Sequence, residues 1–441
     1  EEYASVTSLR SRRRCRDSRV DGWAWKAHNT WACAMSRERP WSTFFRGTLT
    51  HDTPSEASRT LHLGDGQRYI STGPVHVRCD NRIMSMNAII TQGISNAAIK
   101  QVDVPKLAPR SIKVKVLANA LNPTDWKHLD YVGHVGSTVG SDFVGTVVEK
   151  APDAGTSVQV GDRVAGCVHG GWEEGVGAFA DYVITVPEAV VVVPEAMKTE
   201  EAAGLGVAGF TALLGMFQDK HLGLPQPTST DVPPVDPKLK VLVWSGASSV
   251  GQFVIQIARL IGAYVIVTAS KKHEAWLKSL GAAEVHDYAD AETPKRIAGA
   301  HTDIKYAFDT YSMNGSQETI AGILTKEEEN RIVSILSVDE ARVKQINPKT
   351  KATFFILYTV YGKRTEIFGA VFEEDYCKED AEALAKVCSG KDGLFYKLLS
   401  SGAVKPNRTS VQPGGFSGMF QGMDAMRQNK VSGEKLVYPH A

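Results

Sequence analysis

The stretch that most constrains the fold is residues 240–263, KVLVWSGASSVGQFVIQIARLIGA. Residues 241–245 are mostly apolar and β-prone, which predicts a strand buried on both faces of a parallel sheet. From Val250 onward the apolar residues recur three and four positions apart, which predicts a helix with one buried face. A strand, a tight turn and a helix start together leave backbone N–H groups directed at one spot, where a pyrophosphate can bind.

The turn itself consists of Gly246, Ala247, Ser248, Ser249, Val250 and Gly251. In the dinucleotide fingerprint G-x-G-x-x-G, Gly246 and Gly251 match the outer glycines, whereas Ser248 stands at the middle one. A second strand over 264–268, a helical stretch to 280 and a third strand over 284–286 follow. An ordinary βαβ crossover could also contain a glycine turn, but this repeat favours nucleotide binding.

Length and composition exclude several classes of protein. A chain of 441 residues can hold two or more domains, and its formal net charge of +1 gives no sign of nucleic-acid or membrane-surface binding. No apolar run approaches the roughly 20 residues of a membrane-spanning helix. The six cysteines show neither disulfide nor zinc spacing. We therefore expect a reduced, cytoplasmic protein.

The first 85 residues differ in kind from the rest. They hold 14 basic and 9 acidic residues, a net charge of +5, whereas the remaining residues hold 36 and 40, a net charge of −4. No strand alternation or helical stripe persists there. We expect a disordered or non-native extension, with Met86 as the natural beginning; a basic nucleic-acid arm is the alternative.

After Met86, short strands with turn signals between them predict a small irregular barrel. A parallel sheet with helices is expected to follow it. Residues 338–365 resist pattern analysis. The expected strands are 87–92, 111–120, 305–309, 330–336, a sixth sheet strand over 367–372, and 435–438. The expected helices are 200–214, 316–324, 378–387, 394–400 and 416–427, and 225–237 is expected to be a proline-rich surface loop.

Six short motifs in this order resemble the medium-chain dehydrogenase/reductase superfamily. They are Asn122-Pro123-Thr124-Asp125, Gly140-Ser141-Asp142-x-x-Gly145, Gly161-Asp162-Arg163-Val164, Gly177-x-Phe179-Ala180-x-Tyr182, Ala208-Gly209-Phe210-Thr211-Ala212 and the turn that begins at Ser245. The resemblance implies an α/β protein with a GroES-like β-barrel domain, 86–205 with 373–441, and a Rossmann doubly wound parallel-sheet domain, 206–372. The active cleft would lie where the two domains meet.

The resemblance also bears on metal use. Zinc dehydrogenases of this superfamily place Cys and Gly-His-Glu ligands where this chain has Asn122 and Ser141-Asp142. Cys167 and His169 lie two residues apart without a third ligand nearby, and we interpret them as loop residues. No metal site is expected. The chain is most similar to the zinc-independent quinone and enoyl reductases, above all the stand-alone enoyl reductases that assist fungal polyketide synthases.

The end of the second strand bears on the cofactor. NAD enzymes usually have a carboxylate there, whereas this chain has Ser270, Lys271 and Lys272, which suit a 2′-phosphate and favour NADPH. Two lysines at a solvated helix start are the alternative. The resemblance also implies that Tyr288 lies beside the adenosine phosphate. It further implies nicotinamide or ribose neighbours: Thr211, Ile335, Leu336, Val431 and Ser432.

For catalysis, we expect Thr124 and Lys127 to bound the nicotinamide side and to position rather than react. Tyr131 is the candidate proton donor, with water as the alternative. The expected reaction transfers hydride from NADPH to the conjugated C=C bond of a small-molecule or acyl-thioester substrate presented by a polyketide synthase. An NADPH quinone reductase and a non-catalytic NADPH-binding protein remain open, as do a monomer and a homodimer.

Overall fold

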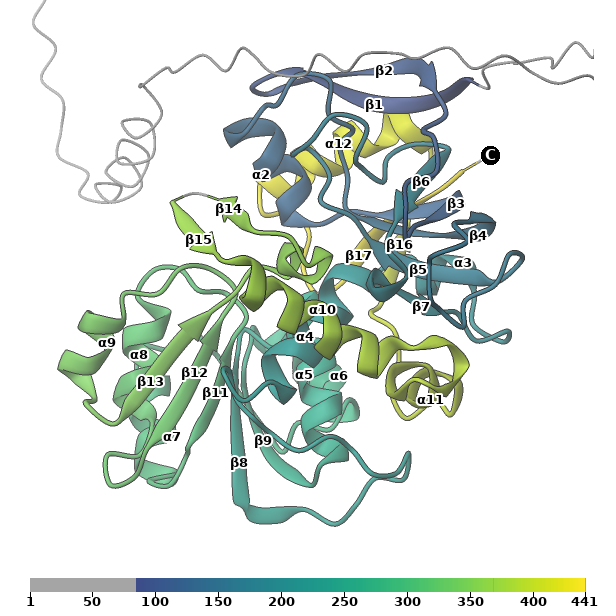
Figure 1. Cartoon of the computed structure of the whole chain (residues 1–441). Helices are drawn as coiled ribbons and strands as arrows, with labels where there is room; N and C mark the ends of the chain where they lie inside the picture. Colours follow the sequence, from purple (N-terminus) through teal and green to yellow (C-terminus); the bar gives the residue numbers. More distant parts are fainter. Residues whose placement is uncertain (1–84, 368, 441) are drawn as a thin grey trace, which may run out of the picture. The chain divides into compact units, whose positions relative to one another are not determined.

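The computed structural model describes residues 85–367 and 369–440 (Figure 1). The chain divides after Asp80 into two units, and the helices and strands described below belong to the second unit. The expectation for residues 1–85 falls outside the described residues, apart from Ser85, which begins strand β1.

A six-stranded parallel sheet forms the middle of the chain. Its strands are β8 (Asp236–Trp244), β9 (Ala263–Thr268), β10 (Glu284–His286), β11 (Tyr306–Asp309), β12 (Asn330–Ser334) and β13 (Thr350–Phe354). They lie in the order β10-β9-β8-β11-β12-β13, with every neighbouring pair parallel. Strands β8, β9 and β10 form one half of the sheet, from its centre outward, and β11, β12 and β13 then form the other half from the centre outward. The strand order therefore reverses between β8 and β11, where such sheets bind ligands.

Helices cover both faces of this sheet because successive side chains of a strand point to opposite sides. Val241 and Val243 of β8 belong to a large cluster that includes the side chains of one pair of helices, whereas Leu242 packs in another cluster with side chains of three other helices. The first pair is α4 (Gly206–Phe217) and α5 (Ser249–Leu260); the second set is α7 (Thr293–Ala300), α8 (Ser316–Ile323) and α9 (Glu340–Ile346). Figure 1 shows α8 and α9 beside β12 and β13. The turn η2 (Lys271–His273) and helix α6 (Glu274–Ser279) follow β9.

A second, mostly antiparallel sheet joins early segments of the chain to its end. Its order is β16-β17-β3-β4-β5-β7, with β6 also paired to β3. The strands are β3 (Ile112–Ala120), β4 (Asp142–Lys150), β5 (Arg163–Cys167), β6 (Tyr182–Thr185), β7 (Val190–Val192), β16 (Thr409–Val411) and β17 (Lys435–Pro439). Phe143 and Phe179 are fully buried in its core. The hairpin β1 (Ser85–Gly93) with β2 (Asn96–Asp103), η1 (Pro187–Ala189), and helices α2 (Pro123–Tyr131), α3 (Thr199–Ala202) and α12 (Gly415–Arg427) complete this part.

The remaining elements lie between β13 and β16. They are η3 (Leu357–Tyr361), β14 (Thr365–Ile367), β15 (Ala370–Phe372), α10 (Glu374–Cys388), η4 (Gly390–Asp392) and α11 (Leu394–Ser400). Over residues 85–367 and 369–440, none of the helices has the length and apolar character needed to span a bilayer.

Two predicted elements were wrong. The sixth strand of the parallel sheet is β13, and residues 365–367 and 370–372 instead form the small antiparallel hairpin β14–β15, in which Gly369 has a φ of +80°. The predicted helix over 200–214 is two helices, α3 and α4. The second begins at Gly206, where a Cβ atom would lie 2.4 Å from the Gly166 carbonyl oxygen. The break lets the Val207 N–H donate to the buried carboxylate of Asp142 at 2.7 Å.

Candidate active site

The glycine turn after β8 is built for close packing. A Cβ atom on Gly246 would lie 2.3 Å from Val267 Cγ1, and one on Gly251 would lie 2.7 Å from the Cα atom of Gly246. These two glycines therefore allow helix α5 to start directly against the sheet. Ser248, at the place of the middle glycine, has an ordinary extended backbone and caps α5 by accepting the Gly251 N–H at 2.9 Å.

The same turn is tied to the neighbouring strand at the point where the strand order reverses. The Ser248 hydroxyl donates to Thr310 Oγ1 at 2.8 Å, and Thr310 Oγ1 lies 2.8 Å from the Trp244 carbonyl oxygen. The N–H groups of Ser249 and Val250 belong to the first helical turn, which has no helical carbonyl to receive them. The turn thus offers amide donors at a helix N-terminus, as a pyrophosphate requires.

A basic cavity of about 630 Å³ lies beside the end of β9. Its lining includes Lys272 and Ser432, both expected from the sequence, together with Arg408 and Lys430, which the sequence analysis missed. His273 joins two sides of the cavity, because Nδ1 lies 3.2 Å from an Arg408 guanidinium nitrogen and Nε2 lies 3.0 Å from Ser432 Oγ. The guanidinium can only donate, so Nδ1 accepts and Nε2–H donates to Ser432. Burial lowers the pKa of His273, in agreement with this neutral ring.

The other predicted cofactor residues lie around this region. Ser270 Oγ donates to the hydroxyl of Tyr288 at 3.1 Å, and Tyr288 is 59% exposed. Ile335 donates its N–H to Ser312 Oγ, in the loop after β11. Of the remaining predicted residues, Thr211 is buried in α4, Lys271 is exposed in η2, and Leu336 and Val431 are partly buried in loops.

Near the start of α2, four polar side chains form one hydrogen-bonded chain. The hydroxyl oxygen of Thr124 lies 2.8 Å from that of Tyr358 and 3.0 Å from His128 Nδ1. His128 Nε2 lies 3.1 Å from His169 Nε2. Burial lowers the pKa of both imidazoles and raises that of the Tyr358 hydroxyl, so all three groups are neutral near pH 7. Ser141 Oγ lies 3.5 Å from the Tyr358 hydroxyl.

Asp125, the next residue after Thr124, is a buried acid at this site. Its Oδ2 accepts the Asn122 N–H at 2.7 Å, which caps α2. Burial raises the pKa of Asp125 to about 7, against the opposing effects of this N–H, the Ser141 hydroxyl and Lys435. The carboxyl is therefore half protonated near neutral pH.

A second polar cluster surrounds the buried ammonium group of Lys435. Lys435 Nζ donates to Asn122 Oδ1 and lies 2.9 Å from Asp142 Oδ2, with the Lys435 and Asp142 side chains 2% and 0% exposed. Asn122 Nδ2 also donates to Asp142, at 2.8 Å. The side chains of Asn122 and Asp142 thus bind both the Lys435 ammonium and each other.

These residues do not fit a catalytic zinc ion. The side chains at the zinc-ligand places are the Asn122 amide, the Ser141 hydroxyl and the Asp142 carboxylate. Asn122 Oδ1 accepts a hydrogen bond from the Lys435 ammonium, and the Asp142 carboxylate is paired with the same ammonium and accepts the Val207 N–H. Within the described ranges, no three His, Cys, Asp or Glu side chains come close enough together to hold a metal. Cys167 accepts a weak contact from Tyr361 instead, and burial strongly raises the pKa of its thiol, whereas zinc requires the thiolate.

A larger cavity, of about 710 Å³, opens beside the hydrogen-bonded chain. Tyr358, His169 and Trp172 line it together with apolar side chains such as Val168 and Val360, and charged residues stand along other parts of its wall. The imidazole of His169 is stacked between two rings, with centroids 3.6 Å from Tyr358 and 4.9 Å from Trp172. The cavity therefore offers an apolar space with two polar groups in fixed positions, as a small-molecule site requires.

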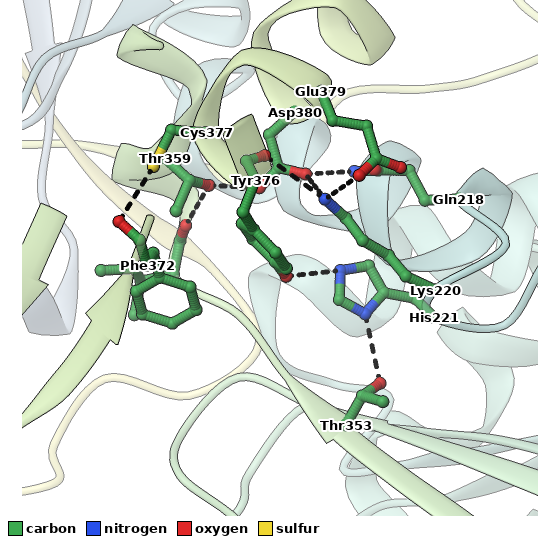
Figure 2. Close-up of polar contacts among 11 residues, drawn as sticks. Gln218, Lys220, His221, Thr353, Thr359, Phe372, Tyr376, Cys377, Glu379 and Asp380 are labelled. Atoms are coloured by element: carbon green, nitrogen blue, oxygen red, sulfur yellow. Dashed lines mark hydrogen bonds and ion pairs between the residues drawn. The ribbon is translucent and has the colours of Figure 1, made fainter. Parts of the chain in front are cut away.

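A buried polar network fixes the segment that carries Tyr358. Figure 2 shows Thr359 and Lys220 converging on the carboxylate of Asp380, which is 0% exposed. Thr359 Oγ1 donates to Asp380 Oδ2, Lys220 Nζ lies 2.7 Å from Oδ1, and the amide of Gln218 donates to Oδ1 at 2.8 Å. The ammonium of Lys220 also lies 3.5 Å from the centre of the Tyr376 ring. This network joins η3 to α10 and to the end of α4.

The predicted catalytic residues are not all brought together. Thr124 lies in the hydrogen-bonded chain, whereas Lys127 points its ammonium over the Trp126 ring at 5.8 Å, and burial lowers its pKa. Tyr131 is 45% exposed and packs its ring against Trp126, 6.3 Å between centroids. His128 was missed although it follows Thr124 by four residues on a helix, a spacing that places both on one face.

Comparisons with known proteins agree with this architecture. The family description "Alcohol dehydrogenase GroES-like domain" matches residues 108–195, and "Zinc-binding dehydrogenase" matches residues 249–386. The trans-enoyl reductase caaB of Aspergillus niger is 33% identical over 360 residues, 80% of this chain and 96% of that protein. The trans-enoyl reductase traG of Penicillium crustosum is 31% identical over 364 residues, again 80% and 96%.

Solved structures share the fold at lower identity. The quinone oxidoreductase from Coxiella burnetii has a TM-score of 0.60 at 23% identity and covers 81% of this chain and 100% of its own. The CurK enoyl reductase has a TM-score of 0.60 at 20% identity, with 80% and 99% covered. The predicted fold class, a GroES-like barrel with a Rossmann sheet, is confirmed. The chain therefore belongs to the medium-chain dehydrogenase/reductase superfamily, in the family of the fungal trans-enoyl reductases, and it is an oxidoreductase.

Proposed function

We propose that this chain reduces the conjugated C=C bond of an α,β-unsaturated acyl compound with NADPH and without a metal ion. The observation that carries the proposal is the 710 Å³ cavity, in which an apolar wall meets the neutral Tyr358 hydroxyl and the His169 imidazole. An acyl chain suits the apolar wall, and the neutral Tyr358 hydroxyl suits a carbonyl oxygen as a hydrogen-bond donor. Similarity to proteins named trans-enoyl reductases supports the same reaction.

The residues around the glycine turn fit a phosphorylated dinucleotide. The N-terminus of α5 would hold the pyrophosphate, and Lys272, Arg408 and Lys430 would hold the 2′-phosphate. The first carboxylate after β9 belongs to Glu274, which is paired with Lys278 at 2.8 Å. No carboxylate stands at the strand end itself, between Thr268 and Lys272, although Glu434 also lines the cavity. Bound there, NADPH would supply the hydride that adds to the β-carbon of the substrate.

Reduction of a conjugated bond needs no Lewis acid at this site. When hydride adds to the β-carbon, negative charge moves to the carbonyl oxygen, and fixed hydrogen-bond donors can stabilise that oxygen. Thr124 and Lys127 would bound the nicotinamide side and orient the reactants. The stacked rings of His169 and Trp172 would form one wall of the cavity.

For the substrate, we propose an enoyl thioester presented by a polyketide synthase. A thioester carbonyl conjugated with the double bond provides the oxygen on which charge can collect. The names of the relatives, trans-enoyl reductases, support an acyl substrate supplied by a separate protein.

The test is a panel of electron acceptors with the purified full chain. We expect NADPH oxidation, followed at 340 nm, with N-acetylcysteamine thioesters of (E)-2-enoic acids, and the same rate after dialysis against a chelator. Oxidation with simple quinones but not with enoyl thioesters would assign a quinone reductase instead. Cofactor binding without turnover of any acceptor would assign a non-catalytic NADPH-binding protein, and loss of activity on chelation would contradict the metal-free reaction.

A further inference from the structure

We propose that Tyr358 donates the proton that completes the reduction at the α-carbon, and that Thr124, His128 and His169 return a proton to it from the water of the cavity. This inference rests on the proposed function. Its basis is the continuous series of contacts Tyr358–Thr124–His128–His169, at 2.8, 3.0 and 3.1 Å, which begins and ends at the 710 Å³ cavity. Tyr358 lies in η3, Thr124 and His128 lie in α2, and His169 lies in the loop after β5. The series therefore joins three segments that are far apart in the sequence.

The hydrogen positions follow from what each neighbour can accept. His128 Nδ1 lies 2.9 Å from the Thr124 carbonyl oxygen, which can only accept, so Nδ1 carries the hydrogen. A neutral imidazole holds one hydrogen, so Nε2 of His128 accepts. His169 must then carry its hydrogen on Nε2 and donate it across the 3.1 Å contact. This leaves His169 Nδ1 as the ring atom that can take a proton from cavity water.

The transfer balances without any co-reactant besides water. Once hydride has added to the β-carbon, the Oη–H bond of Tyr358 breaks and a C–H bond forms at the α-carbon. The phenolate takes the Thr124 hydroxyl proton, Thr124 takes the Nδ1 proton of His128, and His128 Nε2 takes the proton of His169. His169 then accepts a proton at Nδ1 from a cavity water, and the hydroxide that remains takes up a proton from the solvent. Both imidazoles end neutral, in their opposite tautomers.

The structure holds Tyr358 in position for this role. Its ring is parallel to that of His169, with an interplanar angle of 7°, and its hydroxyl is bonded to Thr124. Thr359, the next residue, is anchored to the buried carboxylate of Asp380 (Figure 2). Burial raises the pKa of the Tyr358 hydroxyl, which keeps the donor protonated until charge develops on the substrate.

The first test uses a substrate whose α-carbon becomes stereogenic, the N-acetylcysteamine thioester of (E)-2-methylbut-2-enoic acid. In D₂O the parent protein should add one deuteron at the α-carbon in a single configuration. We expect Tyr358→Phe to lower kcat by roughly 10²-fold and to give both configurations, since water then delivers the deuteron. Unchanged kcat and configuration in Tyr358→Phe, or loss of both in Tyr131→Phe instead, would overturn the proposal.

The control is Tyr264→Phe, which removes a hydroxyl bonded to Glu284 at the edge of the parallel sheet. It should keep both the rate and the single configuration.

The second test separates proton return from packing. His169→Ala leaves space between the rings of Tyr358 and Trp172, and we expect it to lower kcat about tenfold or more while the product keeps one configuration. Added imidazole should restore the rate with a saturable dependence on its concentration. If imidazole and the non-basic ring thiophene act alike, His169 only fills space and the relay is wrong.

A third readout needs neither cofactor nor substrate. Nitrogen-15 NMR of histidine-labelled full chain, assigned with the single variants, should show His128 in its Nδ1–H tautomer and His169 in its Nε2–H tautomer. The reverse pair of tautomers would contradict the relay. If the parent protein reduces no enoyl thioester while these tautomers are found, the proposed function fails and not the hydrogen-bonded series.

Discussion

Asp125 gives the most quantitative prediction, because it is a carboxyl group 1% exposed in the candidate site. In Asp125→Asn the side chain keeps its shape, and its amide oxygen can still accept the Asn122 N–H that caps α2. The side chain of the variant cannot ionise. Its amide nitrogen also adds N–H donors, which change the free energy of unfolding by an amount that does not depend on pH. The charged groups that act on Asp125 are Asp142 and Lys435, and both remain.

The magnitude follows from the pKa of Asp125 in the folded state, about 7, against 3.8 in the unfolded chain. Between these values the folded state binds the proton and the unfolded state has lost it, so stability falls as pH rises. The slope for this one group is about −1.4 kcal/mol per pH unit between pH 5 and 6.5, and it vanishes above pH 8. Across pH 5 to 8 the free energy of unfolding of the parent protein should thus fall by roughly 2.5 kcal/mol relative to Asp125→Asn.

The assay is urea unfolding at pH 5, 6, 7 and 8, with the difference in unfolding free energy between parent and variant plotted against pH. Taking this difference removes the contributions of other groups, such as His221, whose pKa is lowered to about 3 by burial. Asp231→Asn, an exposed residue of the loop before β8, is the matched control and should give a flat difference. A flat difference for Asp125→Asn, or one that rises with pH, would refute the reasoning.

Three further predictions concern the cofactor site and the network of Figure 2. Lys272→Ala should raise KM for NADPH by at least tenfold while KM for NADH stays within about twofold, since it loses a charge-assisted bond to the 2′-phosphate worth roughly 1.5–3 kcal/mol. Gly251→Ala should abolish calorimetric binding of NADPH, because its Cβ would lie 2.7 Å from the backbone of Gly246. Asp380→Ala should lower the free energy of unfolding by about 3–5 kcal/mol in urea, because it removes the buried partner of the Lys220 ammonium, which then keeps only the exposed carboxylate of Glu379 at 3.2 Å.

Each of these has a matched control. Lys295→Ala removes an exposed lysine and should change neither KM value; equal losses for both cofactors in Lys272→Ala would contradict phosphate recognition. Gly299→Ala adds a methyl group in a helix with no atom within 4 Å, so binding should persist. For Asp380, the double variant Asp380→Leu with Lys220→Met should recover part of the lost stability, and no recovery would argue against an unpaired charge as the cause.

Local patterns predicted most elements, because each has its own apolar period and its own turn signals. Strand β10 and helix α11 were predicted with the bounds that the structure shows. Strand β13 was missed because its sequence, Thr350-Lys351-Ala352-Thr353-Phe354, is mostly polar and contains no apolar run, although Thr350 and Ala352 are buried. The break between α3 and α4 depends on the contact of Gly206 with Gly166, which no local pattern contains.

The candidate site was predictable only in part, for a similar reason. The glycine turn is a local motif, and its residues could be named in advance. The contact between Thr124 and Tyr358 joins residues 234 positions apart, and Tyr358 lies in the stretch that resisted pattern analysis. Arg408 and Lys430 join Lys272 only because the chain's end returns to the Rossmann sheet.

The central claim is that this chain delivers hydride to the β-carbon of an enoyl thioester. The most direct measurement is the reaction with NADPH deuterated at the transferred position of C4 and the N-acetylcysteamine thioester of crotonic acid in ordinary water, with the product examined by NMR. We predict one deuterium at the β-carbon, a solvent hydrogen at the α-carbon, and one NADPH consumed per double bond. Deuterium at the carbonyl carbon, or no reduced product while NADPH binds, would contradict it.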